Sequence, residues 1–328
     1  MKKEIFLSFF VCLGFLASAQ VVINEYSAAN YSDIDFQTGP GSAYEDWIEL
    51  YNTSGTTVDL GGYFLSDKLN NIQKWSFPAG VTIPGNGHLV ILASSRNGLN
   101  YGYQNTNFKL TQTDGNEYVI LANTAGIIVD SIRLNYANQK NDSRGRISDG
   151  NAVWGVFTDP SEGASNSNSF TKYADEVLFD VAPGAYPNAQ TVTISSTEPT
   201  SSIRYTTNGS DPTGASNLYS VPLNITSTTV IRAKAFSSDP QVLPSHTETN
   251  SYFINENHTV KILSVSGNSV GTLFGGTQIE PEGSLELFEV DGSFLTEATG
   301  EFNKHGNDSW VYGQRGVDFI ARDQFGIN

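Results

Sequence analysis

A glycine-flanked serine has the spacing in this sequence that is most suggestive of catalysis. Residues 267–271 read Gly-Asn-Ser-Val-Gly, which matches the G-x-S-x-G pattern of a nucleophilic serine on a strand-to-helix turn. Such a site also needs an acid and a downstream histidine, and His305 is the one histidine that follows Ser269 in the sequence. No helical pattern follows Ser269, so the motif is interpreted as a plain turn and no catalytic residue is predicted.

A cluster of acidic residues near the N-terminus is a second candidate site. It contains Asp33, Asp35, Glu45, Asp46 and Glu49. Carboxylate oxygens are the ligands that Ca²⁺ prefers, and the candidate metal ligands are Asp33, Asp35 and Asp46. The segment lacks the complete D-x-[DN]-x-[DN]-G calcium loop, so solvated surface acids are the alternative interpretation.

Three tryptophans are candidate stacking platforms for sugars. Trp47, Trp75 and Trp154 each offer a flat apolar ring with a polar edge, which suits a saccharide face if the ring is exposed. Aromatic residues at strand positions also pack in cores, and that alternative stays open. The four histidines show no zinc-ligand spacing, and the sequence contains no cofactor motif.

Composition and charge narrow the function classes. The chain has 328 residues with a formal net charge of −16, and 31 glycines and 12 prolines punctuate short runs of β-branched and aromatic residues. Nucleic-acid binding depends on Lys and Arg, so this charge argues against a nucleic-acid partner. The length predicts two or three domains.

The first 19 residues have the features of a secretory signal peptide. Lys2 and Lys3 precede an apolar run, and the sequence Ala-Ser-Ala at 17–19 is a cleavage motif. The apolar run is too short to span a membrane, so we expect no transmembrane segment in the mature chain and a secreted or cell-surface location. Cys12 is the one cysteine, and the mature chain is therefore expected to fold without disulfides.

The segment from Ala43 to Asp67 indicates how the first module is built. Ile48 and Leu50 alternate with Trp47, Glu49 and Tyr51, as in a strand, and residues 52–55 have turn chemistry that predicts a hairpin-like unit. With the segments 143–150 and 158–166, this pattern resembles the lamin tail domain over residues 20–171. The resemblance implies an immunoglobulin-like β-sandwich. Residues 161–169, rich in Ser and Asn, are interpreted as a linker.

A second module is expected at residues 177–255. The segment 203–213 reads Ile-Arg-Tyr-Thr-Thr-Asn-Gly-Ser-Asp-Pro-Thr, with alternation followed by turn dipeptides. The segment is similar to the chitobiase/β-hexosaminidase C-terminal domain, with its Tyr-Thr-Thr-x-Gly-x-x-Pro signature. That resemblance implies an accessory sandwich that lacks the catalytic carboxylates.

The third segment, residues 258–328, has strand patterns at 260–265 and 284–289. Together with the segments 301–310 and 313–319, it resembles the N-terminal part of the CotH spore-coat kinase family. That family's catalytic and metal-binding residues are expected beyond Asn328, so none is assigned in this chain.

The sequence therefore predicts an all-β protein, with tandem immunoglobulin-like β-sandwiches followed by a partial, strand-rich third segment. The leading functional hypothesis is a non-catalytic surface scaffold that positions a downstream domain and binds a cell-surface glycan or protein. The alternatives are the N-terminal part of a CotH-type protein kinase and a calcium-dependent adhesin. Ca²⁺ is the one cofactor considered.

Overall fold

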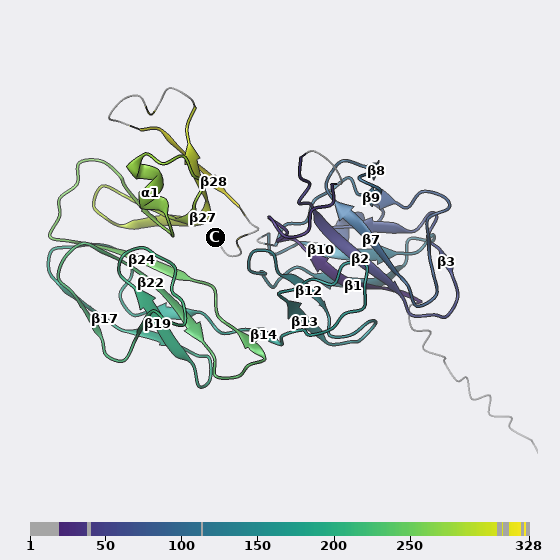
Figure 1. Cartoon of the computed structure of the whole chain (residues 1–328), viewed down its shortest axis with the longest axis horizontal. Coiled ribbons are helices and arrows are strands. Elements are labelled where there is room, and N and C mark those ends of the chain that lie inside the picture. Colours follow the sequence, from purple (N-terminus) through teal and green to yellow (C-terminus); the bar gives the residue numbers. More distant parts are fainter. Residues whose placement is uncertain are drawn as a thin grey trace, which may run out of the picture.

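The regular secondary structure of the described residues is almost entirely β-strand, and the strands form two sandwiches and a C-terminal sheet (Figure 1). A computed structural model describes residues 20–37, 41–112, 114–306, 310, 315–322 and 325. The predicted signal peptide, residues 1–19, lies outside the described residues. The predicted all-β class is confirmed. Within the described residues, no helix has the length and apolar character needed to cross a bilayer.

The first sandwich consists of two main sheets and a small strand pair. A 3₁₀ turn, η1 (Leu69–Asn71), connects two strands of the smaller main sheet. Its larger sheet runs, in spatial order, β13 (Trp154–Phe157), β12 (Ser143–Arg146), β1 (Val21–Ser27), β2 (Asp46–Asn52), β7 (His88–Ala93), β9 (Tyr103–Asn105) and β8 (Gly98–Asn100). The facing sheet runs β11 (Ile128–Arg133), β10 (Tyr118–Ala122), β4 (Phe64–Ser66) and β5 (Trp75–Ser76), and β3 (Val58–Asp59) pairs with β6 (Thr82–Ile83).

Strand β2 is buried on both of its faces. Ile48 and Leu50 point into the main core between the sheets, as their alternation predicts. Trp47 points the other way and packs with Phe36 and Leu92 in a second apolar cluster. Because both faces are covered, the polar side chain of Glu49 on this strand must also be buried.

The predicted hairpin after β2 is wrong. Strand β2 pairs with β1 and β7, whereas β3 pairs with β6. The buried side-chain amide of Asn52 donates to the carbonyls of Thr56, Ile83 and Pro84 at 2.7–3.1 Å. These hydrogen bonds anchor residues 52–56 against residues 83–84, so the chain leaves the first sheet where the turn chemistry suggested that it would double back.

The second sandwich follows a short connection. Its main sheet runs β16 (Gly184–Tyr186), β24 (Glu248–Ile254), β22 (Thr229–Phe236), β19 (Ser202–Thr206) and β20 (Asn217–Leu218). Two strand pairs cover one face: β15 (Val177–Phe179) with β18 (Ile194–Ser196), and β17 (Gln190–Val192) with β21 (Leu223–Ile225). Ile231, Ala233 and Tyr252 fill the core between these layers.

The C-terminal sheet runs β25 (Ile262–Ser266), β26 (Glu282–Phe288), β27 (Phe294–Lys304) and β28 (Val317–Ala321), all antiparallel. A short helix, α1 (Val270–Gly275), covers part of one face and buries Leu273 against Phe302. The other face of the sheet lies against β22 and β24, so the main sheet of the second sandwich is covered on both sides (Figure 1).

Candidate functional site

A buried polar cluster lies on the outer face of the first sandwich, between β1, β2 and the segment 158–166. The side-chain amide of Asn24 donates to Glu49 at 2.9 Å, to Asp149 at 3.0 Å and to Asn166 at 2.9 Å. The carbonyl oxygen of the Asn24 amide accepts the backbone N–H of Gly150 at 3.1 Å. One wholly buried asparagine therefore joins four separate segments of the chain.

Glu25 and Glu49 lie side by side in this cluster, on paired positions of β1 and β2. Glu25 accepts hydrogen bonds from the hydroxyls of Ser143 at 2.5 Å and Ser161 at 2.6 Å, and Glu49 accepts the backbone N–H of Gly163 at 2.6 Å. Burial raises the pKa of Glu49 to about 8, and burial also raises the pKa of Glu25. Donors from the protein itself satisfy these buried carboxyls. The cluster therefore has a structural role, because it attaches the segment 158–166 to β1 and β2.

This cluster corrects the linker prediction for residues 161–169. Ser161, Gly163 and Asn166 are hydrogen-bonded to the outer face of the first sandwich through Glu25, Glu49 and Asn24. The small polar residues of this segment serve as donors and acceptors at a buried surface, which composition alone cannot distinguish from a flexible linker.

The structure does not bring the predicted calcium ligands together. Asp35 accepts the backbone N–H groups of Gln37 at 3.0 Å and Ala43 at 2.8 Å, and Asp46 accepts the backbone N–H of Leu110 at 3.3 Å. Asp33 lies on the surface, where partial desolvation and the negative charge of Asp159 raise its pKa. Among the described residues, no group of three or more His, Cys, Asp or Glu side chains is placed to hold a metal ion.

The tryptophans do not form an exposed platform. Trp47 is 0% exposed and Trp75 is 5% exposed, so neither ring presents a face to a ligand, and the stacking prediction is wrong for both. Their strand positions point into apolar clusters, which was the alternative interpretation. Trp154 is half-buried, and its ring contacts Tyr26 and the guanidinium of Arg146.

The serine motif also differs from the sequence interpretation. A helix does follow Ser269, because α1 begins at Val270 directly after it. Ser269 is the N-cap with φ 65°, in the left-handed region, and its side chain makes no capping hydrogen bond. The downstream His305 is paired, at 2.7 Å, with Asp318, which lies on the largely exposed strand β28. The helix has six residues and covers an antiparallel sheet, and the described contacts supply Ser269 with no general base.

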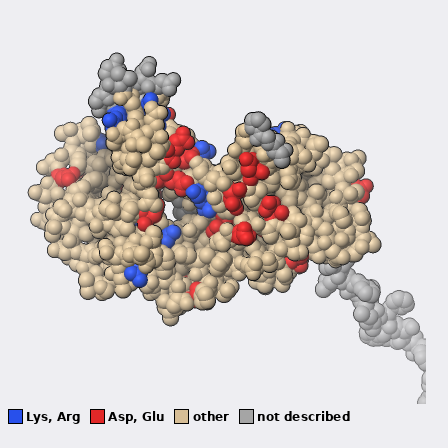
Figure 2. Space-filling view, viewed as in Figure 1, with Lys and Arg blue, Asp and Glu red and all other residues tan. Residues whose placement is uncertain are grey.

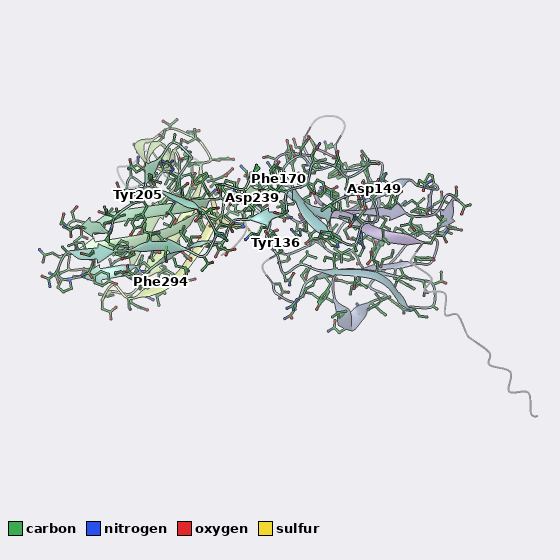
Figure 3. All side chains as sticks on the ribbon, turned by 90° about the horizontal axis from the view of Figure 1, so that it is seen from below. Tyr136, Asp149, Phe170, Tyr205, Asp239 and Phe294 are labelled. Atoms are coloured by element: carbon green, nitrogen blue, oxygen red, sulfur yellow. The ribbon has the colours of Figure 1, made fainter. Side chains whose placement is uncertain are left out.

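A dense contact joins the first sandwich to the second; it is formed by residues 136–142, 171–174 and 241–246 and is called the joint here. β14 (Lys172–Tyr173) pairs in parallel with β23 (Val242–Leu243). The hydroxyl of Tyr173 donates to Asp142 at 2.5 Å and accepts the backbone N–H of Gln139 at 2.9 Å. The Tyr173 ring stacks on Tyr136 at 5.8 Å and meets the edge of His246 at 5.3 Å. In Figure 3, Tyr136 and Phe170 lie at this junction beside Asp239.

A second interface joins β22 and β24 to the C-terminal sheet. Arg232 is 4% exposed, pairs with Asp211 at 2.5 Å and donates to Ser284 at 3.4 Å. Glu286 accepts the hydroxyl of Ser251 at 2.5 Å and its backbone N–H at 3.1 Å. Next to these polar contacts, Phe253 packs edge-on against Phe288 with ring centroids 5.1 Å apart. We call this contact the sheet interface.

Sequence reasoning missed the sheet interface, although a signal was present. Strand β22 alternates Ile231, Ala233 and Ala235 with Arg232 and Lys234. Alternation of this kind predicts one core face and one polar face, and it does not show that the polar face is covered. The covering element comes from residues 262–301, far along the chain.

The stability of the chain is expected to fall as the pH rises from 5.5 to 8. Burial raises the pKa of Glu286 to about 7 and that of Glu49 to about 8, so the folded state holds protons that the unfolded chain releases above about pH 4.5. Burial lowers the pKa of His246 to about 4, which acts in the opposite direction below about pH 6.5. The two carboxyls outweigh the one imidazole.

Thermal unfolding at the two pH values measures this effect. The expected loss of unfolding free energy between pH 5.5 and pH 8 is on the order of 3–4 kcal/mol. Glu286→Gln should reduce the pH dependence, and the matched exposed variant Glu256→Gln should not. A chain whose stability rises with pH over this range would contradict the assignment of protonated buried carboxyls.

Two family models match the chain. The Lamin Tail Domain model matches residues 16–135, and the Chitobiase/beta-hexosaminidase C-terminal domain model matches residues 181–247. The first match ends before β12 and β13, which belong to the same sheet as β1 and β2. Neither match reaches residues 258–328, so the resemblance of that segment to the CotH kinase family stays a prediction. No curated protein matches the chain.

Both matched families fit the immunoglobulin-like sandwiches that the structure shows. The chain is thus similar to a lamin tail domain followed by a chitobiase/β-hexosaminidase C-terminal domain, and this combination indicates a binding or scaffold protein.

Proposed function

We propose that this chain is a secreted, non-catalytic scaffold that holds its modules in one fixed arrangement and positions a further domain or partner at the cell surface. The observation that carries the proposal is the joint, where aromatic rings and buried hydrogen bonds connect the two sandwiches. A flexible tether between domains is typically rich in Gly, Ser or Pro and makes few contacts. Here the connecting strand β14 is itself paired with β23.

Additional contacts restrain the arrangement from the side of the C-terminal sheet. Lys140 of the first sandwich pairs with Glu282 of β26 at 2.5 Å. The ring of Tyr31 lies 5.0 Å from that of Phe325, and the side chain of Lys140 lies over both rings. All three parts of the chain therefore contact one another, which supports a rigid scaffold.

Export is part of this proposal and is supported by the sequence of residues 1–19. The chain has one cysteine, at position 12, so the proposed mature scaffold depends on its cores and interfaces for rigidity. Localisation by cell fractionation, with N-terminal sequencing of the product, tests this part. Recovery in the cytosol with Met1 retained would contradict export.

The Tyr173→Phe variant is expected to loosen the joint. Without the hydroxyl, the buried Asp142 loses its donor and the N–H of Gln139 loses its acceptor, which costs on the order of 2 kcal/mol. Limited proteolysis should then cut near residues 171–176 several-fold faster than in the parent. Tyr219→Phe is the matched control, because no hydrogen bond of its hydroxyl to another described residue is present. Equal cleavage rates for the two variants would contradict a rigid joint.

A further inference from the structure

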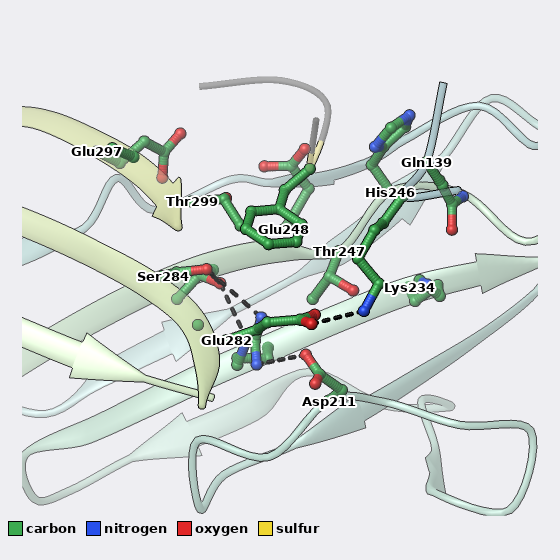
Figure 4. Close-up of a pocket in the computed structure, with 16 residues that line it drawn as sticks. Gln139, Asp211, Lys234, His246, Thr247, Glu248, Glu282, Ser284, Glu297 and Thr299 are labelled. Atoms are coloured by element: carbon green, nitrogen blue, oxygen red, sulfur yellow. Dashed lines mark hydrogen bonds and ion pairs between the residues drawn. The ribbon is translucent and has the colours of Figure 1, made fainter. Parts of the chain in front are cut away.

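A small cavity lies where the first sandwich, the second sandwich and the C-terminal sheet meet (Figure 4). Its volume is about 190 Å³. Gln139 and Lys140 come from the first sandwich, Lys234 and residues 246–249 from the second, and Glu282, Glu297 and Thr299 from the C-terminal sheet. Ligand sites are common at such meeting points. Drug-sized ligands need roughly 300–1,000 Å³, so this cavity suits a single ring or a smaller molecule.

Two ion pairs in the cavity leave one cation, Lys234, and two acids, Glu248 and Glu297, without an ion pair among the described residues. Lys140 pairs with Glu282 at 2.5 Å, and Arg232 pairs with Asp211 at 2.5 Å. The side chain of Lys234 is half-buried and forms no hydrogen bond or ion pair within the described part of the chain, although the carboxylates of Asp211 and Asp142 attract its charge. Burial lowers the pKa of Lys234 despite these two carboxylates, so the charge of its ammonium is incompletely compensated, and a bound carboxylate would supply a charge-assisted hydrogen bond.

The rest of the lining is rich in groups that bind hydroxyls. Glu248 and Glu297 line the cavity, and their carboxyl groups have no hydrogen-bond or ion-pair partner among the described residues. Burial and the nearby acids Glu176 and Glu297 raise the pKa of Glu248 to about 7. The side chains of Gln139 and Thr247 add further polar atoms, and the ring of Phe325 supplies an apolar surface. In Figure 4, Glu248 and Glu297 lie above Asp211 and Glu282, with Lys234 to the right. Carboxylate acceptors, amide groups and an aromatic ring around one cavity suit the hydroxyls and the flat face of a sugar ring.

The surroundings of the cavity restrict the charge of the ligand. Figure 2 shows acidic side chains on both walls of the notch between the first sandwich and the rest of the molecule, with basic side chains toward its floor. A polyanion would be repelled by these walls, whereas a single carboxylate on a ring with several hydroxyls satisfies one ammonium and leaves donors for the acids. A neutral sugar would leave the Lys234 ammonium without a charge-assisted hydrogen bond.

We propose that this cavity binds one hexuronate unit of an acidic glycan, with its carboxylate on Lys234 and its hydroxyls on Glu248, Glu297 and Gln139. The site goes beyond the scaffold role, because a rigid arrangement of modules needs no ligand. It replaces the predicted tryptophan platform with a site that no single module contains.

NMR titration of the purified protein tests this proposal with sodium D-glucuronate and sodium D-galacturonate as probes. D-Glucose and sodium acetate are the comparison compounds, since glucose has the ring hydroxyls without a carboxylate and acetate has a carboxylate without the ring. The expected result is saturable binding of at least one uronate, at least tenfold tighter than either comparison compound. No saturable binding of either uronate at tens of millimolar, or equal binding of acetate or glucose, would overturn the proposal.

Variants connect the binding to this cavity. Lys234→Gln should weaken uronate binding at least tenfold, and Lys261→Gln, which alters an exposed lysine paired with Glu289, should leave it unchanged. Because Lys234 has no ion pair to lose within the described residues, Lys234→Gln should unfold at the same or a higher temperature than the parent, so weak binding cannot be attributed to misfolding. Retention of full uronate affinity by Lys234→Gln would overturn the assignment.

Discussion

Replacing Asn24 with alanine is expected to destabilise the first sandwich by about 3–4 kcal/mol. The substitution removes the amide that donates to Glu49, Asp149 and Asn166, and it leaves acceptors of two carboxyl groups without that donor in a buried site. An unpaired buried group costs its desolvation free energy, which is larger for an ionised carboxylate such as that of Asp149, whose pKa is lowered, than for a neutral group. The segment 158–166 should lose its attachment at the same time.

Urea unfolding monitored by tryptophan fluorescence measures this loss, because Trp47 and Trp75 are buried in the first sandwich. Hydrogen exchange should show faster exchange of residues 161–166 in Asn24→Ala than in the parent. Asn107→Ala is the matched control: its amide donates one exposed hydrogen bond, to the carbonyl of Lys74, and the expected loss is under about 1 kcal/mol. Losses of equal size in the two variants would show that the cluster does not fasten the segment.

Replacing Phe288 with alanine is expected to cost about 3–5 kcal/mol and to release the C-terminal sheet from the second sandwich. Phe288 is 0% exposed, and its ring contacts Phe253 at 5.1 Å and Phe294 at 5.6 Å between centroids. Removing it leaves a cavity at the apolar end of the sheet interface, next to the buried carboxyl of Glu286. The polar contacts that remain are weaker without an apolar neighbour that excludes water.

Hydrogen exchange distinguishes this release from general unfolding. In Phe288→Ala, the amides of β25 to β28 should lose protection while those of β1 and β2 keep it. Phe294→Ala is the matched control, because Phe294 is 40% exposed and its removal leaves a smaller buried void. Full protection of the C-terminal sheet in Phe288→Ala would contradict the importance of the sheet interface.

The sequence predicted the parts of the fold that depend on local alternation. Ile48 and Leu50 face the core as their spacing indicates, and the turn- and strand-rich composition gives the all-β class. The predictions failed where a distant segment decides the environment. Trp47 is buried by residues from positions 34–36 and 90–103, and β2 could not be recognised as doubly covered from its own residues.

The candidate sites were harder to predict for the same reason. Asp35 and Asp46 are acids in a loop and at a strand start, and their partners are backbone N–H groups that no side-chain pattern reveals. The cavity at Lys234 is assembled from residues 139–325, so its parts are ordinary surface residues until the three modules meet. Alternation in β22 indicated a polar face, and only the arrangement of the sheets shows what that face contacts.

We infer that the two sandwiches and the C-terminal sheet form one rigid body through the joint and the sheet interface. Small-angle X-ray scattering of the purified protein in solution tests it most directly. The account predicts one compact particle whose scattering matches a single arrangement of the modules, and a Tyr173→Phe variant with a measurably larger radius of gyration. A curve for the parent protein that requires an ensemble of extended and bent arrangements would contradict it.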